Sequence, residues 1–229
     1  MAIDPLGPKI AEGRDSEIFE HGPGRVLRRN FFARDLTNEG RLMNHVRAHG
    51  YPVPEVFDAG DGWLVMERIN GANLIDSMRK TVAGVRAAGR ELARLHVQLA
   101  KIPAPDYLVA APGDAGEAIV HLDLHPLNVM TDDRGSVVID WANAKRGVAE
   151  ADVANTWMLL KAGQVQGKLV DRLVVLFGRR ILTGAFLSKV DRAAAARQLK
   201  AVAEWRAFDR NMSPKEIALM NALVAKAGI

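Results

Sequence analysis

The sequence predicts an α+β protein of two lobes, with a small antiparallel-sheet lobe carrying one helix over residues 1–70 and a larger helical lobe over 71–229. Turn signals recur at short intervals in the first part, which is typical of short strands. Apolar residues recur at helical spacing in the second part. Between these helices, two short strands bracket a polar motif at residues 119–139.

Strand signals dominate the first 70 residues. Short apolar runs end at turn signals such as the His-Gly-Pro-Gly stretch at 21–24. One helix interrupts them, with Thr37 or Asn38 as the expected N-cap and Gly50 as the expected end. The strands are expected at 10–13, 17–20, 25–28 and 63–66, with another before the turn at 58–62.

Helical periodicity dominates from residue 74 onward. One helix is expected to bury a stripe formed by Val82, Val85, Leu92, Leu95 and Leu99. Short strands are expected at 119–120 and 137–139, and the chain after Ala151 is expected to be helical. The last helix begins with a capping-box pattern made by Ser213, Pro214 and Glu216.

Composition excludes several classes of protein. The chain has no Cys, which excludes disulfide scaffolds, thiolate metal sites and cysteine nucleophiles. Its N-terminus lacks the basic run and apolar core of a signal peptide, and no apolar run approaches the roughly 20 residues of a membrane helix. The net charge of +4 is spread out, without the aromatic residues that stack bases. We expect a cytoplasmic monomer that binds neither nucleic acid nor a membrane.

One polar motif combines the groups needed for phosphoryl transfer from a nucleotide. Asp123 follows a short apolar strand, Asn128 lies five residues later, and Asp140 ends the next strand. A carboxylate beside an acceptor hydroxyl can orient it and take its proton. Amide and carboxylate oxygens are ligands that Mg²⁺ prefers, so Asn128 and Asp140 are the expected metal ligands and Asp123 the expected base. Alternatively, Asp123 and Asn128 only begin and end a turn.

A different metal site is an alternative interpretation of the same stretch. His121, Asp123 and His125 alternate, so all three would face one way on a strand and could bind the transition metal of a hydrolase. Pro126 and the polar run indicate that the strand ends near Asp123, which would spoil this alignment. In the phosphotransfer hypothesis, His121 is a structural hydrogen-bonding residue, and His125 lies near the acceptor entrance.

These motifs carry a family resemblance. The stretch His-Leu-Asp-Leu-His-Pro-Leu-Asn at 121–128, with Ile-Asp-Trp at 139–141, resembles the catalytic loop and metal-binding segment of the aminoglycoside phosphotransferase family. The likeness extends over roughly residues 8–160. It implies a protein-kinase-like fold with ATP, or alternatively GTP, in the cleft, and the roles already given to the base and the two Mg²⁺ ligands. Asp152 resembles a buried acidic residue that braces the loop, although a helix N-terminus would equally favour it.

The nucleotide phosphates should meet a basic residue of the N-terminal lobe, where the family commonly uses Lys. This chain has no Lys between Lys9 and Lys80, so an Arg takes the role or the role is absent. Val26 and Arg28 share one strand face, which would place Val26 beneath the adenine and Arg28 at the phosphates. Glu39, on the next helix, is the expected partner of Arg28. The alternative is that Arg28 and Glu39 are surface charges.

Two further segments resemble nucleotide-binding positions more weakly. The turn at 13–17 has a single Gly, and its N–H groups and the Ser16 hydroxyl are expected to face phosphate oxygens. The segment from Met66 to Ile69 resembles the connector whose backbone pairs with adenine, here through the Glu67 carbonyl and the Ile69 N–H. An ordinary strand end would carry the same side chains.

The acceptor is expected to be a hydroxyl of a small molecule. Residues 150–229 hold 13 Lys and Arg against 7 Asp and Glu, whereas a polycationic aminoglycoside needs a cluster of carboxylates. A neutral or acidic hydroxyl compound fits this balance better. Trp157, Trp205 and Phe208 could line its pocket, although their helical spacing favours core positions.

Two other functions stay open. The absent Lys and the single-Gly turn favour a pseudokinase-like protein that binds nucleotide with little or no catalysis. Transfer to a protein side chain is a third hypothesis. It is disfavoured because Asp140 is followed at once by Trp-Ala-Asn, and not by a long phosphorylatable segment.

Overall fold

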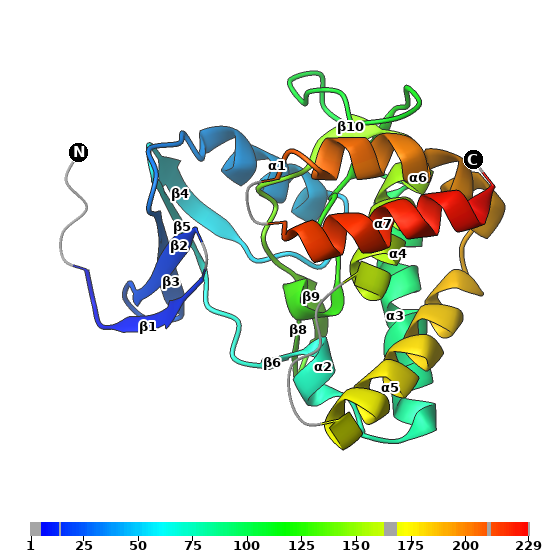
Figure 1. The fold of residues 1–229 in the computed structure, drawn as a ribbon. Helices are drawn as coiled ribbons and strands as arrows, with labels where there is room; N and C mark the ends of the chain where they lie inside the picture. Colours follow the sequence, from blue (N-terminus) through cyan, green and yellow to red (C-terminus); the bar gives the residue numbers. More distant parts are fainter. Residues whose placement is uncertain (1–5, 14, 163–168, 210–211, 229) are drawn as a thin grey trace. The chain divides into compact units, whose positions relative to one another are not determined.

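The computed structural model describes residues 6–13, 15–162, 169–209 and 212–228. The chain divides into two compact units, whose helices and strands are labelled in Figure 1. The first unit joins Met1–Ala72 to Met130–Ala142, and the second joins Asn73–Val129 to Asn143–Ile229. The expected α+β class is confirmed, since a sheet dominates the first unit and helices dominate the second.

A five-stranded antiparallel sheet forms the centre of the first unit, in the order β1-β2-β3-β5-β4. Its strands are β1 (Lys9–Glu12), β2 (Ser16–Glu20), β3 (Arg25–Asn30), β4 (Val56–Gly60) and β5 (Trp63–Glu67). On β3, Val26 lies opposite Met66 of β5, and Arg28 lies opposite Leu64. Leu27 packs into an apolar cluster on the other face. The strand alternation therefore places Val26 and Arg28 on one face, as expected.

Helix α1 (Thr37–Ala48) packs against β4. Gly40 permits this close approach, because a Cβ there would lie 3.1 Å from the nearest side-chain atom of β4. The predicted cap position is wrong, since the N-cap is Leu36, whose apolar side chain cannot cap. The Asp35 carboxylate takes over from one residue earlier and accepts the Thr37 N–H at 2.8 Å.

A second, three-stranded sheet has the order β6-β8-β9 and is made of β6 (Ala72–Asn73), β8 (Val129–Asp132) and β9 (Gly135–Val138). The sequence does not predict β8, because four mixed residues show no strand pattern. Two contacts tie the segment 130–142 to the N-terminal residues. The Val138 N–H donates to the Pro52 carbonyl at 2.8 Å. The Trp141 ring packs edge-on against Tyr51, with centroids 5.7 Å apart.

The second unit is mainly helical. It contains the paired strands β7 (Ala118–Val120) and β10 (Lys145–Gly147) and the helices α2 (Leu74–Ser77), α3 (Val82–Leu99), α4 (Ala149–Ala162), α5 (Leu169–Leu187), α6 (Arg192–Arg206) and α7 (Pro214–Ala227).

The predicted stripe on α3 is buried except for Val82, the first residue of the helix. The capping box at Ser213 is confirmed. Trp157 is buried as expected, but Phe208 follows α6 and is 90% exposed, so its predicted core position is wrong.

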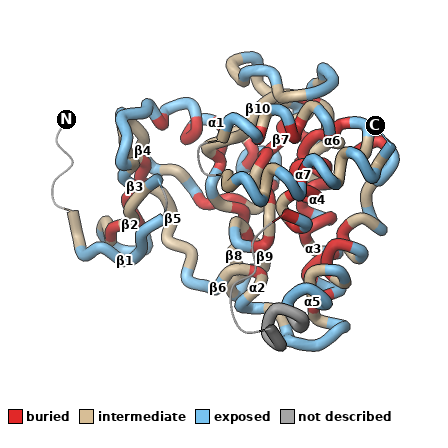
Figure 2. The backbone as a smooth tube through the Cα atoms, viewed as in Figure 1, coloured by how far each residue is buried: buried red, intermediate tan, exposed pale blue. Residues whose placement is uncertain are grey.

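Helix α4 is the central element of this unit, and most of its length is buried (Figure 2). Helices α6 and α7 pack against α4, while α3 and α5 run side by side (Figure 1). A helix surrounded in this way carries apolar residues on every side, so its sequence shows no single apolar stripe. Among the described residues, no helix combines the length and the apolar character that crossing a bilayer would require.

The close packing of α3 on α5 predicts opposite effects for two Gly→Ala substitutions. Gly89→Ala should lower the free energy of unfolding by about 1–3 kcal/mol, because its Cβ would lie 2.5 Å from the Leu182 carbonyl oxygen and 2.9 Å from the Ala185 Cβ. A Cβ at Gly184 would have no described atom within 4 Å. Gly184→Ala should therefore raise the free energy of unfolding by roughly 0.5–1 kcal/mol, because Ala loses less backbone entropy on folding than Gly. Denaturant titration measures both shifts, and equal shifts would contradict the packing.

Candidate active site

The loop after β7 contains the predicted catalytic residues of the second unit. The strand ends at Val120, and Leu122 then adopts a φ of +55°. This left-handed conformation costs a branched side chain about 1–3 kcal/mol, so its surroundings must hold it. The 3₁₀ helix η1 (Pro126–Asn128) closes the loop, and Nδ1 of the His125 ring accepts the Leu127 N–H at 3.2 Å.

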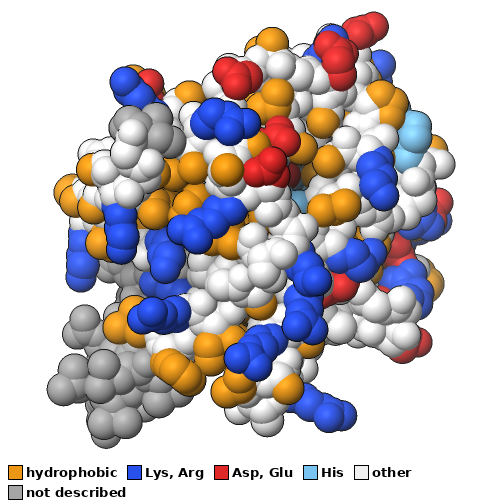
Figure 3. All heavy atoms as spheres, turned by 90° about the vertical axis from the view of Figure 1, so that its right-hand side faces the viewer, with side chains coloured by type: hydrophobic (Ala, Val, Ile, Leu, Met, Phe, Trp, Pro, Cys, Tyr) orange, Lys and Arg blue, Asp and Glu red, His pale blue; other side chains and the backbone are white. Residues whose placement is uncertain are grey.

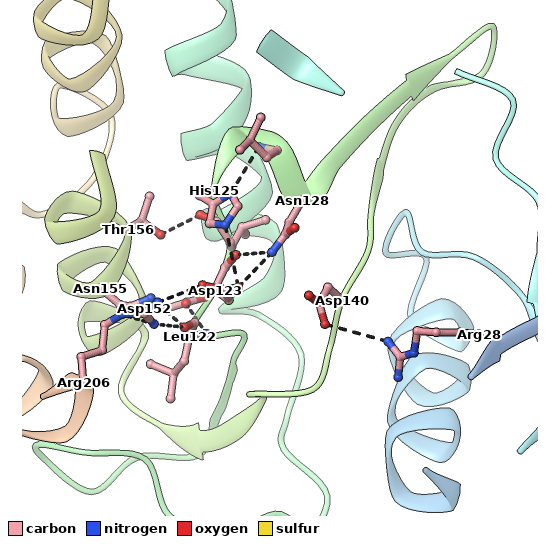
Figure 4. Close-up of polar contacts among 12 residues, drawn as sticks. Arg28, Leu122, Asp123, His125, Asn128, Asp140, Asp152, Asn155, Thr156 and Arg206 are labelled. Carbon is pink, nitrogen blue, oxygen red and sulfur yellow. Dashed lines mark hydrogen bonds and ion pairs between the residues drawn. The ribbon is translucent and has the colours of Figure 1, made fainter. Parts of the chain in front are cut away.

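Helix α4 supplies the groups that hold this turn (Figure 4). The Asp152 carboxylate accepts the backbone N–H of His121 at 3.0 Å and that of Leu122 at 2.7 Å. Asn155 donates to the Leu122 carbonyl at 2.7 Å, and the Thr156 hydroxyl donates to the carbonyl two residues further on, also at 2.7 Å. Asp152 is only 3% exposed, so the buried brace implied by the resemblance is confirmed.

Asp123 and Asn128 contact each other directly. The Asn128 Nδ2 donates to the Asp123 carbonyl at 3.0 Å and to its carboxylate Oδ2 at 3.1 Å. Because the amide nitrogen faces Asp123, the Asn128 Oδ1 is the atom left to bind a cation, and such a hard oxygen fits Mg²⁺. The Asp123 side chain is 17% exposed, so it is held in place yet open to a ligand.

Arg206, which the sequence does not predict as a site residue, contacts the same carboxylate. It is the last residue of α6 and is 5% exposed. Its Nη2 lies 3.3 Å from the Asp123 Oδ1, and its Nη1 lies 3.2 Å from both the Leu122 carbonyl and the Asn155 Oδ1. Eighty-three residues separate Arg206 from Asp123. No spacing in the sequence reveals the contact, because the surrounding stretch is rich in basic residues.

In the first unit, the expected ion pair between Arg28 and Glu39 is present. The Arg28 Nη2 donates to the Glu39 Oε2 at 2.7 Å, and both residues are 7% exposed. The interpretation of these residues as surface charges is therefore wrong. Burial alone would lower the pKa of the Arg28 guanidinium, but the carboxylates of Glu39 and Asp140 together raise it above its ordinary value.

Asp140 follows β9 in a left-handed conformation, with a φ of +64°. Asp tolerates this region better than most residues. The next residue, Trp141, is buried and donates its indole N–H to the Val138 carbonyl at 3.1 Å, which anchors the segment. The Asp140 side chain stays 50% exposed, with its Oδ1 3.9 Å from the Arg28 Nη1 (Figure 4). Asp140 belongs to a different unit from Asn128, so the sharing of one ion by these residues stays a prediction.

Three more of the predicted nucleotide-binding residues lie in strands of the first unit. Ser16 opens β2, and the Gly13 N–H donates to its carbonyl at 2.8 Å across the turn. Arg14, in the same turn, lies outside the described residues. Val26 is buried and pairs with Met66 in the sheet. Their contacts with a nucleotide stay predictions.

Glu67 ends β5, and its side chain has a structural partner. Its Oε1 accepts a hydrogen bond from Arg134 at 2.5 Å, and Arg134 also binds Asp132 at 2.7 Å. The carboxylates of Asp132 and Glu67 raise the pKa of the Arg134 guanidinium. These contacts fasten the β8–β9 turn to the end of β5. The Glu67 carbonyl and the N–H of Ile69, two residues further on, stay the predicted adenine contacts.

The structure does not support the transition-metal site. The strand ends at Val120, and the left-handed turn at Leu122 removes the alternation that would align His121, Asp123 and His125. Within the described part of the chain, no group of three or more His, Cys, Asp or Glu is arranged to hold a metal ion. His121 is fully buried beside the loop, and its backbone N–H donates to Asp152.

A comparison with protein families identifies the family of this chain. A family model described as the phosphotransferase enzyme family (APH) matches residues 8–115 and 104–182. The chain belongs to this phosphotransferase family. The match includes the catalytic loop at 121–128 and the segment 139–141, so the resemblance drawn from these motifs is confirmed.

Solved structures confirm the protein-kinase-like fold. A thermostable mutant of aminoglycoside phosphotransferase APH(4)-Ia, in ternary complex with AMP-PNP and hygromycin B, matches with a TM-score of 0.68 and 17% identity, over 98% of this chain and 94% of that chain. A choline/ethanolamine kinase family protein from Mesorhizobium loti matches with a TM-score of 0.58 and 14% identity, over 98% and 87% of the two chains.

A curated relative is similar over a shorter stretch. The probable serine/threonine-protein kinase BUD32 homolog of Archaeoglobus fulgidus is 30% identical to the phosphotransferase chain over 120 residues, which is 52% of this chain. The chain spans about half, 51%, of that relative's length. The name of this relative describes a probable serine/threonine-protein kinase, whereas the two solved structures are named as an aminoglycoside phosphotransferase and a choline/ethanolamine kinase family protein.

Asp152→Asn should lower the free energy of unfolding by about 1–3 kcal/mol. An Asn side chain offers one acceptor, so its NH₂ group would face one of the two N–H groups that Asp152 now binds. Asp106→Asn is the matched control, because the Asp106 side chain is fully exposed. Denaturant titration of both variants tests this role of Asp152. Equal free energies of unfolding for the two variants would contradict it.

His96 should make stability depend on pH. Its Nδ1 lies 2.8 Å from the Leu92 carbonyl and its Nε2 lies 2.9 Å from the Thr156 hydroxyl. Burial lowers the pKa of His96 below its ordinary value of 6.5, against the opposing effects of Asp152 and the Leu92 carbonyl. The unfolded chain therefore binds a proton that the folded state does not, and stability present above pH about 6.5 is lost as the pH falls toward the lower folded pKa.

This pH effect is measured by denaturant titration between pH about 7.5 and about 5.5. The free energy of unfolding of the unmodified chain should fall more steeply over this interval than that of His96→Gln, because Gln carries no titrating group. Parallel curves for the two proteins would show that His96 is not buried as a neutral ring.

Proposed function

We propose that the chain transfers the γ-phosphoryl group of ATP to a hydroxyl of a small molecule. The observation that carries this proposal is the Asp123–Asn128 pair, fixed in a loop that α4 braces, in a member of a phosphotransferase family. The pair presents one partly exposed carboxylate and one amide oxygen to a ligand, which are the groups that a base and a metal ligand need.

Asp123 would act on the acceptor. Its carboxylate would accept the hydrogen bond of the acceptor O–H and orient the oxygen toward the γ-phosphorus. As the new O–P bond forms, the bond from the γ-phosphorus to the bridging oxygen breaks, ADP leaves, and the hydroxyl proton passes to Asp123. Mg²⁺, when bound, would neutralise phosphate charge, and the Asn128 Oδ1 and the Asp140 carboxylate would hold it.

Residues of the sheet unit would bind the nucleotide. Arg28 would meet the phosphates in place of the family's Lys. Its ion pair with Glu39 at 2.7 Å supports this role, because the pair fixes a buried cation on the strand. Val26, Met66, Ser16 and the backbone of the connector at 67–69 would contact the remaining parts of the nucleotide. A solved neighbour with AMP-PNP favours ATP as the donor, with GTP as the alternative.

The charge of the helical unit argues against a polycationic acceptor. Basic side chains are spread over the face that Figure 3 shows. Burial lowers the pKa of Lys161 on α4, and repulsion from Arg180, Lys226, Arg179 and Arg192 lowers it further. A polycation would add to this repulsion. A neutral or acidic hydroxyl compound therefore fits better than the aminoglycoside bound by the APH(4)-Ia neighbour.

Transfer to a Ser or Thr of a protein is a second candidate. The observation that favours it is the likeness to the probable serine/threonine-protein kinase of Archaeoglobus fulgidus. A panel of hydroxylated metabolites and a panel of Ser- and Thr-containing proteins, each tested for ADP release with MgATP, separate the two candidates. Nucleotide binding without ADP release from either panel would favour the protein with little or no catalysis.

Asp123→Asn tests the base. With the best acceptor of the two panels, kcat should fall about 100- to 10,000-fold, while the Kd for ATP stays close to that of the unmodified chain. Asp106→Asn, the same chemical change at an exposed position, should leave kcat unchanged. Full activity of Asp123→Asn would refute the assignment of Asp123 as base.

A further inference from the structure

The Arg206 guanidinium faces three oxygens of the catalytic loop and its brace. One nitrogen, Nη1, contacts two uncharged oxygens, the Leu122 carbonyl and the Asn155 Oδ1, both at 3.2 Å. The other, Nη2, contacts the carboxylate Oδ1 of Asp123 at 3.3 Å. The two nitrogens therefore divide the contacts, one holding the loop and the other holding the Asp123 side chain (Figure 4).

Burying this cation is costly unless a carboxylate balances it. The Arg206 side chain is 6% exposed, and Asp123 is its ion-pair partner. The Arg206 Nε has no hydrogen-bond partner among the described residues. A residue kept only for stability would be expected to use its donors more fully, or to be replaced by an apolar side chain. Within the described part of the chain, the charged group that Arg206 contacts is the Asp123 carboxylate.

We infer that Arg206 is a positioning residue for Asp123. Its Nη2 holds the Oδ1 of the carboxylate, and the Asn128 amide contacts the other oxygen, Oδ2. Two donors from different elements therefore fix the plane of the carboxylate, and the base is preorganised for an acceptor hydroxyl. This inference rests on the proposed role of Asp123 as base.

The test compares Arg206→Gln, Arg206→Lys and Arg197→Gln. Arg197 is an exposed residue of the same helix, so Arg197→Gln is the matched control. ADP release from MgATP, with water as the acceptor, gives kcat and the KM for ATP without knowledge of the natural acceptor. Arg206→Gln should lower kcat by about 10- to 100-fold, with little change in the KM for ATP. Arg206→Lys should restore part of kcat, because it returns the charge but not both contacts.

A double-mutant cycle separates positioning from a general structural role. If Arg206 acts through Asp123, adding Arg206→Gln to Asp123→Asn should change the remaining kcat by less than about twofold. Full multiplication of the two single effects would overturn the inference, as would a kcat of Arg206→Gln equal to that of Arg197→Gln. If Arg206→Gln unfolds, Arg206→Lys decides, and wild-type kcat in that variant overturns the inference.

The same measurements separate this inference from the proposed function. Unchanged kcat in Asp123→Asn would refute the proposed base, whereas low kcat in Asp123→Asn with normal kcat in Arg206→Gln would refute only the role of Arg206. An unmodified chain that binds MgATP but releases no ADP, either with water or with any member of the two acceptor panels, would overturn both.

Discussion

The loop that carries Asp123 depends on one interaction, in which the Asp152 carboxylate accepts hydrogen bonds from two consecutive backbone N–H groups. It holds the chain through a left-handed turn at Leu122, a conformation that this side chain would not adopt by itself. The turn ends β7 and directs the following residues out of the strand path, so that Asp123 becomes partly exposed while its neighbours stay buried. The buried central helix thus determines where Asp123, the proposed base, lies.

The first unit uses a buried charge in a comparable way. Arg28 stands on the middle strand of the sheet and is balanced by Glu39 from the helix that covers it. Breaking such a pair leaves an uncompensated buried charge, which is far more costly than losing a surface ion pair. The fork of the guanidinium also reaches toward Asp140, so one side chain links the sheet, the helix and the segment after β9. Lys, with a single point charge, could not make both contacts in the same way.

Much of this arrangement could be predicted from the sequence, because it depends on local signals. Strand alternation predicts that Val26 and Arg28 share a face, and the polar motif predicts the loop with Asp123 and Asn128. The N-cap of α1 could not be predicted correctly, since the capping group is the Asp35 side chain, which lies one residue before the N-cap Leu36 and outside the expected positions 37 and 38. The short strand β8 shows no pattern that distinguishes it from a loop.

Arg206 was beyond prediction for a different reason. Its role depends on the packing of α6 against α4, which brings residues far apart in the sequence into contact. Hydrophobic periodicity places α6 as a helix but does not specify which of its basic side chains turns inward. The exposed Phe208 illustrates the same limit, because helical spacing alone places it in the core.

The way the chain passes between its two compact units bears on any attempt to dissect the protein. It crosses between them three times, near residues 72, 129 and 142, so neither unit is a continuous piece of the gene. A fragment ending at Ala72 would lack the Trp141 ring that covers Tyr51 and the backbone donor that occupies the Pro52 carbonyl. It would also lack Asp140. Expression trials should therefore keep both units on one polypeptide. A fragment ending before residue 142 would leave the core of the first unit incomplete, and a fragment ending at 142 would remove α4 and its contacts with the loop that carries Asp123.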